Sequence, residues 1–253
     1  MEAQKGRKSP PGFPELQILD VPSNLQILTL FIALLWGSGD GQSDDFQKGN
    51  AAFMKKDYAS ALKEWSALAE QGHARAQNGL GLLYLNGLGV KVDTDRALKW
   101  IQKSANADDP RGQVNLGRMF ARGQGVPKSD YSAIIWFSRA AEQGHTRAQY
   151  NLGVMYENGQ GVPKDPMIAA KWYRLAAEQG YANAQFKLGY FYNLGLGVSK
   201  NLKTAVKWYR LSAEQGFADA QLNLGFMYEY GKGISKSGEI IDLGVEMNII
   251  QKA

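Results

Sequence analysis

The residues whose types and spacing could support catalysis do not form an active site. Ser60 and Lys63 have the S-x-x-K spacing in which a lysine can activate a serine nucleophile, but no K-T-G or S-D-N segment follows them. His73 and His145 are the only histidines, and the chain contains no cysteine. These ligands are too few for a usual histidine or cysteine zinc site. We therefore expect no catalytic residues, no metal site and no cofactor.

Two further patterns have structural explanations. The glycine-rich run at residues 37–41, GSGDG, lacks the G-K-[ST] ending of a phosphate-binding loop. Glu142, Glu178 and Glu214 are evenly spaced 36 residues apart, so they are one carboxylate per repeated unit and not a catalytic pair. We expect each of them in the last turn of a helix, facing solvent or a neighbouring lysine.

The charge of the chain favours a solvated basic surface over a nucleic-acid-binding protein. The 253 residues include 29 Lys and Arg against 24 Asp and Glu, for a net charge of +5. The basic residues are interspersed with acidic ones and form no single cluster. A hydrophobic content of 44% is sufficient for a folded core.

An apolar run near the amino terminus predicts export. Residues 25–36, LQILTLFIALLW, are followed at once by small and polar residues. A membrane span needs about 20 apolar residues, so this run better fits the core of a signal peptide within an extension at residues 1–41. Lys5, Arg7 and Lys8 lie far from the run, so the usual compact basic segment before it is missing. A buried helix and an uncleaved anchor remain alternatives.

Most of the chain repeats a unit of 36 residues. Each unit carries a glutamine, a Leu-Gly pair, an aromatic residue three positions after that glycine, and a GxG loop ending in Val or Ile. The glutamines are Gln77, Gln113, Gln149, Gln185 and Gln221, and the glycines of the Leu-Gly pairs are Gly81, Gly117, Gly153, Gly189 and Gly225. A register kept through five units predicts a stack of repeated supersecondary structures.

Each unit predicts two helices. The first runs from about the glutamine to the residue before the first loop glycine, and the second follows a residue that favours the N-cap position. These N-cap candidates are Asp93, Ser129, Asp165, Asn201 and Ser237. The second helix is expected to end at a left-handed glycine, followed by a residue that covers the helix end. The glycines are Gly72, Gly144, Gly180 and Gly216, and the covering residues are His73, His145, Tyr181 and Phe217.

The glycine of each Leu-Gly pair lies inside the first helix, where it costs about 0.5–1 kcal/mol relative to alanine. We expect close approach of the second helix to offset this cost. The residues expected opposite the glycines are an alanine and a tryptophan of that helix: Ala133 and Trp136, Ala169 and Trp172, and Ala205 and Trp208.

The repeated pattern AxxxLGxxYxxGxGVxxDxxxAxxWYxxAAEQG resembles the Sel-one-like repeat, a relative of the tetratricopeptide repeat. The resemblance covers residues 75–253, as units at 75–110, 111–146, 147–182 and 183–218 and a degenerate unit at 219–253. Residues 42–74 look like a shorter capping unit of the tetratricopeptide type. The resemblance implies an all-α fold, a right-handed α-solenoid of stacked helix-turn-helix repeats. It also implies binding of protein partners, commonly in the bacterial envelope, and no catalysis.

In such a solenoid the first helix of each unit lines the concave groove. The free face of these helices carries arginines on the first three units and aromatic residues on the last two. Arg and Tyr are frequent at binding hot spots, and Arg binds carboxylates with two hydrogen bonds. The candidate partner-binding residues are Arg75, Arg111, Arg118, Arg122, Arg147, Tyr150, Asn158, Tyr190, Asn193, Phe226 and Tyr230. They predict a protein or peptide ligand with an acidic end and an apolar end. The simpler alternative is that the aromatics pack between neighbouring helices and the arginines are solvated.

These observations predict an interaction scaffold or adaptor that is exported to the periplasm or secreted. After processing it is expected to have no membrane span. Two alternatives stay open. One is a cytoplasmic signalling adaptor, and the other is a glycan-binding or cell-wall-binding module or enzyme. A glycan binder would use Tyr190, Phe226 and Tyr230 as stacking platforms.

Overall fold

The computed structural model describes residues 39–229, which form eleven α-helices and no strand. The helices are α2 (Gly39–Met54), α3 (Tyr58–Glu70), α4 (Ala74–Asn86), α5 (Thr94–Asn106), α6 (Pro110–Arg122), α7 (Asp130–Glu142), α8 (Thr146–Asn158), α9 (Pro166–Glu178), α10 (Ala182–Leu194), α11 (Leu202–Glu214) and α12 (Ala218–Glu229). The all-α prediction is therefore confirmed. Contacts between Cα atoms divide the chain into two units, Met1–Ser43 and Asp44–Ala253. The helices from α3 onward belong to the second unit.

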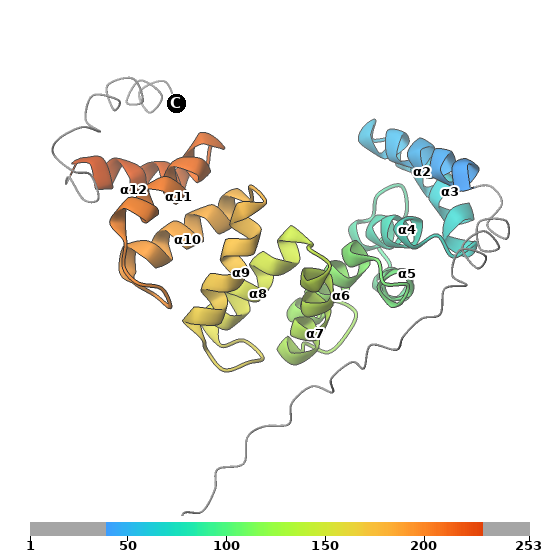
Figure 1. Cartoon of the computed structure of the whole chain (residues 1–253). Helices are drawn as coiled ribbons and strands as arrows, with labels where there is room; N and C mark the ends of the chain where they lie inside the picture. The colour runs from blue at the N-terminus through green and yellow to red at the C-terminus, as the bar shows by residue number, and fades with distance from the viewer. Residues whose placement is uncertain (1–38, 230–253) are drawn as a thin grey trace, which may run out of the picture. The chain divides into compact units, whose positions relative to one another are not determined.

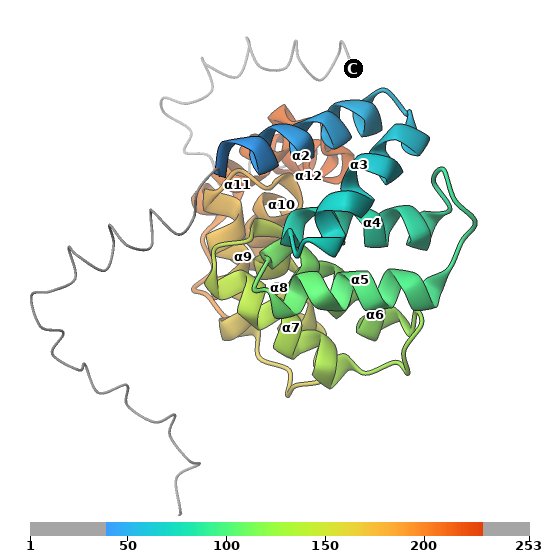
Figure 2. The same ribbon diagram turned by 90° about the vertical axis from the view of Figure 1, so that its right-hand side faces the viewer.

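The helices from α3 to α12 stack in chain order, because each of them packs against the next. Figures 1 and 2 show these helix pairs following one another, which is the α-solenoid that the 36-residue period predicts. No helix between residues 39 and 229 is long and apolar enough to cross a membrane. The apolar run at residues 25–36 and the part of the degenerate unit after Glu229 lie outside the described residues.

Polar side chains begin the second helix of each unit, as predicted. The side chain of each cap accepts a hydrogen bond from a backbone N–H in the first turn: Asp93 from Arg96, Ser129 from Ser132, Asp165 from Met167 and Ile168, and Asn201 from Thr204. The fifth candidate, Ser237, lies outside the described residues.

The first helix of each unit begins three residues before the glutamine, earlier than the sequence suggested. Three of the four residues expected only to cover the preceding helix end are also the N-caps of the next helix, so one short turn serves both helices: His73, His145 and Tyr181. At His73 the backbone N–H donates to the carbonyl of Leu68, while the Nδ1 atom accepts from Ala76 N–H at 3.2 Å. Gly72, with φ of 90°, supplies the left-handed conformation that this turn requires.

The glycine inside the first helix is required by close approach of the second helix. A Cβ atom at Gly153 would lie 2.5 Å from the ring of Tyr173, and one at Gly189 would lie 2.8 Å from the ring of Tyr209. The expected close approach is therefore present, but its aromatic partner is different. The nearest ring is that of the residue after the tryptophan, which faces the glycine more directly than Trp172 does. Trp172 itself is half-buried at the edge of a neighbouring cluster.

The repeated glutamine joins successive units through hydrogen bonds. Gln149 donates from Nε2 to the carbonyl of Ala141 at 3.3 Å, and its Oε1 accepts from Gln179 Nε2 at 2.7 Å. Gln185 makes the same two bonds one unit later, with Ala177 and Gln215. Because Gln149 and Gln185 are almost fully buried, these bonds satisfy polar groups that would be costly to leave unpaired. The glutamine period therefore has a structural cause.

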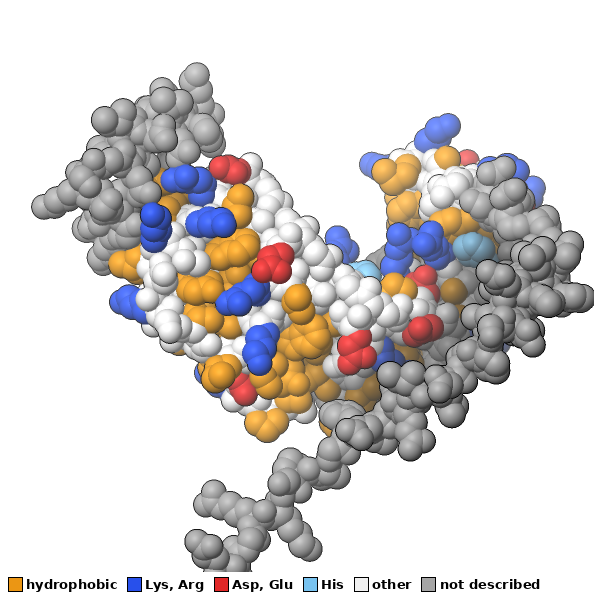
Figure 3. All heavy atoms as spheres, in the orientation of Figure 1, with side chains coloured by type: hydrophobic (Ala, Val, Ile, Leu, Met, Phe, Trp, Pro, Cys, Tyr) orange, Lys and Arg blue, Asp and Glu red, His pale blue; other side chains and the backbone are white. Residues whose placement is uncertain are grey.

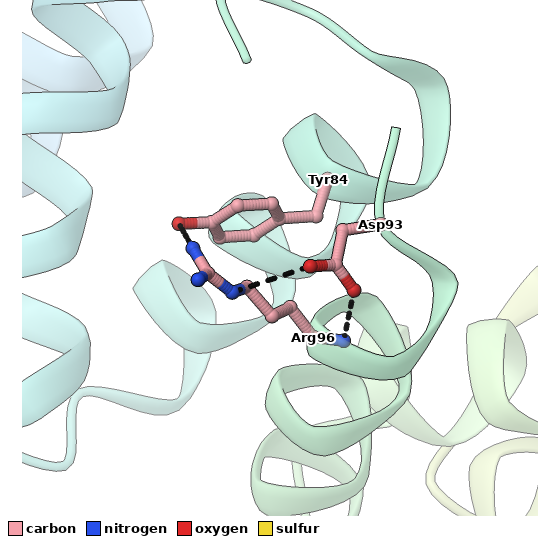
Figure 4. A network of polar contacts seen from close by, with 3 residues as sticks. All are labelled: Tyr84, Asp93 and Arg96. Atoms are coloured by element: carbon pink, nitrogen blue, oxygen red, sulfur yellow. Dashed lines mark hydrogen bonds and ion pairs between the residues drawn. The ribbon is translucent and has the colours of Figure 1, made fainter. Parts of the chain in front are cut away.

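Tyr84 in the last turn of α4, the cap residue Asp93 and Arg96 of α5 form a small polar cluster in the first 36-residue unit (Figure 4). Arg96 forms an ion pair with Asp93 at 3.2 Å and donates to the hydroxyl of Tyr84 at 3.4 Å. Since this cluster is exposed, it contributes little stability beyond the cap itself. It links the last turn of α4 to the start of α5.

Candidate functional site

A cavity of about 960 Å³ lies among α4, α6 and α8 and the segment before α10. It is built from the first helices of three successive units, which is the face that the resemblance assigned to the groove. The lining residues are Asn78, Leu82, Arg111, Val114, Asn115, Arg118, Arg122, Gly144, His145, Thr146, Arg147, Tyr150, Asn151, Gln179, Gly180 and Tyr181.

Four arginines face this cavity without an acidic partner. Arg111, Arg118, Arg122 and Arg147 all belong to the lining, and the lining contains no Asp or Glu. Within residues 39–229 none of the four forms an ion pair. Partial burial, and then the neighbouring Arg122 and Arg147, lower the pKa of Arg118. The cavity therefore has an uncompensated positive potential that favours anionic ligands.

The four arginines are exposed, and Arg118 donates a hydrogen bond to the side-chain oxygen of Asn115 at 3.4 Å. Asn115 in turn donates to Asn78 on α4 at 2.8 Å. This chain of amides supports the wall between α4 and α6. It leaves most of the guanidinium hydrogen-bonding capacity of Arg118 available, because a guanidinium carries five N–H donors.

The lining of the cavity also includes aromatic and apolar residues. The rings of Tyr150 and Tyr181 meet edge to face with centroids 5.2 Å apart. Leu82 and Val114 contribute aliphatic surface. Burial raises the pKa of Tyr150, so its hydroxyl stays protonated in neutral solution. A ligand in the cavity can therefore meet charged and apolar surface within one site.

His145 is a cavity residue that the sequence did not single out for binding. Its Nδ1 atom is buried and makes no hydrogen bond within the described residues. The sequence placed it only at the end of a helix. Because His73 and His145 are two units apart, the sequence could have identified them as equivalent positions. It could not have shown that their surroundings differ.

Only some of the eleven candidate partner-binding residues line the cavity. Five of them line the cavity: Arg111, Arg118, Arg122, Arg147 and Tyr150. Five others lie outside its lining: Arg75, Asn158, Tyr190, Asn193 and Phe226. The eleventh, Tyr230, lies outside the described residues. A role of any of them in partner binding stays a prediction.

The aromatic candidates outside the cavity have different surroundings. Tyr190 is half-buried and packs against the hydrophobic clusters on both sides of α10. Packing between helices, the simpler alternative raised by the sequence, therefore describes Tyr190. Phe226 on α12 is 49% exposed.

A second polar cluster lies between α8 and α10, and its charges are compensated. Lys187 Nζ is 3.0 Å from Glu157 Oε1, and the hydroxyl of Tyr173 donates a hydrogen bond to the other Glu157 oxygen. The Lys187 and Glu157 side chains are only 28% and 20% exposed. Burial, and then the bond to Glu157, raise the pKa of Tyr173. This cluster connects three helices and presents no free cation.

Comparison with known proteins identifies the repeat. The family model of the Sel1 repeat matches residues 74–109, 110–145, 146–181, 182–217 and 218–240. A search of curated proteins returned no match.

Several solved structures are similar to this chain. A protective antigen of uropathogenic Escherichia coli is 36% identical with a TM-score of 0.72, and the match covers 85% of this chain and 46% of that one. A Sel1 repeat protein from Oxalobacter formigenes is 39% identical with a TM-score of 0.70, over 75% of this chain and 77% of that one. An immunity protein from Pseudomonas aeruginosa is 27% identical with a TM-score of 0.50, over 72% and 69%. This chain thus spans about half the length of the E. coli protein.

Proposed function

Because this chain belongs to the Sel1 repeat family, whose members bind proteins, we propose that it is a scaffold that holds a segment of a partner protein. The segment binds in the cavity among α4, α6 and α8. One observation carries this proposal: four arginines face the cavity, and no carboxylate of the lining compensates them. The role is one of binding and not of catalysis.

The chemistry of the cavity favours an acidic segment with an apolar residue. Arginine can bind a carboxylate through two parallel hydrogen bonds, and these charge-assisted bonds are about twice as strong as neutral ones. Tyr150 and Tyr181 provide a surface for an apolar side chain next to the arginines. The partner segment therefore carries acidic side chains near Arg118 and Arg147, followed by an apolar one.

A pull-down with two charge-matched variants tests this function. The full chain is compared with an Arg118→Glu, Arg122→Glu variant and with a Lys99→Glu, Lys171→Glu variant, each used as bait in extract from the native host. The control lysines are exposed residues of α5 and α9 outside the cavity. We expect a protein that binds the native chain and the lysine variant but not the arginine variant. Equal recovery by all three baits would contradict a role of the cavity.

We further propose that the chain is exported to the bacterial envelope. The support is the apolar run at residues 25–36 with small residues after it. Intact mass of the protein purified from its native host tests this proposal. We expect a mass that corresponds to cleavage near residues 37–41. A mass that includes residues 1–40 contradicts cleavage and leaves the uncleaved anchor and the cytoplasmic adaptor as the alternatives.

A further inference from the structure

Starting from the proposed function, on which this inference rests, we infer that His145 forms a carboxylate subsite together with Arg111 and Arg147. One carboxylate of the bound segment lies at this subsite and accepts a hydrogen bond from the imidazole of His145. The complex forms with uptake of a proton by His145. Binding of the acidic segment is therefore tighter at mildly acidic pH than at neutral pH.

The two histidines of the chain occupy equivalent positions but have different partners. Each is the N-cap of a first helix, His73 before α4 and His145 before α8. The Nδ1 atom of His73 accepts from Ala76 N–H at 3.2 Å, so it is already used in the fold. The Nδ1 atom of His145 is buried and makes no hydrogen bond within the described residues. The imidazole of His145 is therefore not used to cap α8, although His145 lines the cavity, and it is left to interact with a bound group.

The surroundings of His145 also differ from those of His73. Both Arg111 at the start of α6 and Arg147 on its own helix act on His145 and line the same cavity. Among residues 39–229 the carboxylate that acts on it is Asp109, which accepts from the backbone N–H groups of Arg111 and Gly112 at 2.9 Å each. Asp109 is therefore committed to its role as a helix cap.

These surroundings explain why proton uptake accompanies binding. Burial, and then the two arginines, lower the pKa of His145, so its imidazole is neutral in the free protein at pH 7. The other titratable groups of the lining are Arg118 and Arg122 on α6 and the hydroxyls of Tyr150 and Tyr181. A carboxylate that accepts a hydrogen bond from His145 between the two arginines offsets part of their field and stabilises the imidazolium.

The sign of the pH dependence follows from linkage. The bound complex holds a proton on His145 that the free protein lacks, so affinity increases as pH falls from about 7.5 towards 5.5. By reciprocity, the ligand raises the proton affinity of His145 by the same factor. A glutamate ligand remains mostly ionised in this window, because its unperturbed pKa is about 4.3.

The experiment uses the full chain and a fluorescein-labelled tetraglutamate peptide as the probe. Affinity is measured at pH 5.5 and 7.5 for the native chain, for His145→Gln and for His73→Gln. We expect at least about fivefold tighter binding at the lower pH for the native chain and for His73→Gln, in the range typical of coupled sites. For His145→Gln we expect the same affinity at both pH values.

Proton NMR of the imidazole groups provides a second readout that does not depend on the variants. Only two histidines contribute signals, and His145→Gln assigns them. We expect the peptide to move the titration midpoint of His145 upward and to leave that of His73 unchanged. An unchanged His145 midpoint in the complex overturns the inference.

The other outcomes separate the inference from the proposed function. Binding that is independent of pH but lost on Arg118→Glu, Arg122→Glu overturns the His145 subsite and leaves the acidic-segment cavity intact. A pH dependence that persists in His145→Gln also overturns the subsite. Absence of peptide binding at both pH values contradicts the subsite together with the acidic-segment proposal.

Discussion

The cavity among α4, α6 and α8 and the cluster between α8 and α10 are built by the same repeated helices. Only the cluster pairs its basic side chain with a carboxylate. In the cavity, Arg118 and Arg147 face one another without a carboxylate. Between α8 and α10, Glu157 lies within hydrogen-bonding distance of Lys187 and accepts from Tyr173.

The difference shows which region satisfies its own charges and which region leaves charges available to a ligand. The paired cluster satisfies its own charges, so it links α8, α9 and α10 and leaves little for a ligand. The unpaired arginines repel one another, so a bound anion would make their arrangement more favourable. Helix α8 takes part in both regions, since it carries Arg147 near its start and Glu157 near its end. The first helix of one unit can therefore serve binding and packing at opposite ends.

The largest expected effect is on the packing of α8 itself. Gly153→Leu places a side chain where Tyr173 already lies, since a Cβ atom would be 2.5 Å from the Tyr173 ring. Overpacking at this position should cost about 3 kcal/mol and displace the hydroxyl that binds Glu157. Urea unfolding of the native and variant chains measures this loss.

Gly225→Leu on α12 is the matched control, because no atom of residues 39–229 lies within 4 Å of a Cβ placed there. We expect its unfolding midpoint to remain close to that of the native chain. If the two leucine variants unfold at the same urea concentration, close approach is not the reason for the glycine.

The second-largest expected effect is a loss of ligand binding by the cavity without a loss of protein stability. Arg118→Glu, Arg122→Glu should weaken binding of labelled tetraglutamate at least about tenfold, because it replaces attraction by repulsion. Its stability should stay equal or increase, since it relieves repulsion among the four cations. Fluorescence anisotropy and urea unfolding measure the two quantities on the same samples. A parallel loss of both would mean that the arginines are structural.

A smaller effect is expected in the compensated cluster. Glu157→Gln removes the charge that compensates Lys187, and both side chains are mostly buried. We expect a loss of about 1 kcal/mol, because some solvent reaches the pair. Adding Lys187→Met should recover part of this loss. Thermal unfolding of the single and double variants measures these changes in stability. An unaltered melting temperature in Glu157→Gln would show that the Lys187–Glu157 pair does not stabilise the fold.

The smallest effect concerns Tyr209 on α11, which occupies the position of Tyr173 one unit later. Burial raises the pKa of Tyr209 to about 12, whereas an unfolded tyrosine has a pKa of about 10. The stability that Tyr209 contributes as a neutral group is complete below pH 10 and is lost as pH rises through about 12. Tyr209→Phe should therefore unfold with a weaker pH dependence between pH 10 and 12 than the native chain. An identical pH dependence would mean that other groups dominate.

Much of the fold could be predicted from the sequence because its causes are local. The N-cap side chains of Asp93 and Asp165 bond to residues two or three positions away, and the left-handed glycines depend on their own backbone. Because the sequence repeats every 36 residues, the same caps and turns are expected in each unit.

Features that depend on neighbouring units could not be predicted from one unit. The Lys187–Glu157 contact joins residues 30 positions apart in two different units. The ring behind Gly153 is Tyr173 and not Trp172, because the exact rotation of one helix on another is set by packing and not by spacing. Equally, Arg75 and Arg111 occupy equivalent positions in the pattern, but of the two only Arg111 lines the cavity among α4, α6 and α8.

Site-specific photo-crosslinking is the most direct test of the central claim that the cavity holds the partner. A photoreactive phenylalanine analogue is placed at Asn151, which lines the cavity, or at Phe226, which is exposed on α12. Each full chain is irradiated in native-host extract. The account predicts a crosslinked partner from position 151 that disappears with Arg118→Glu, Arg122→Glu, and none from position 226. The same partner crosslinked only from position 226 would contradict it.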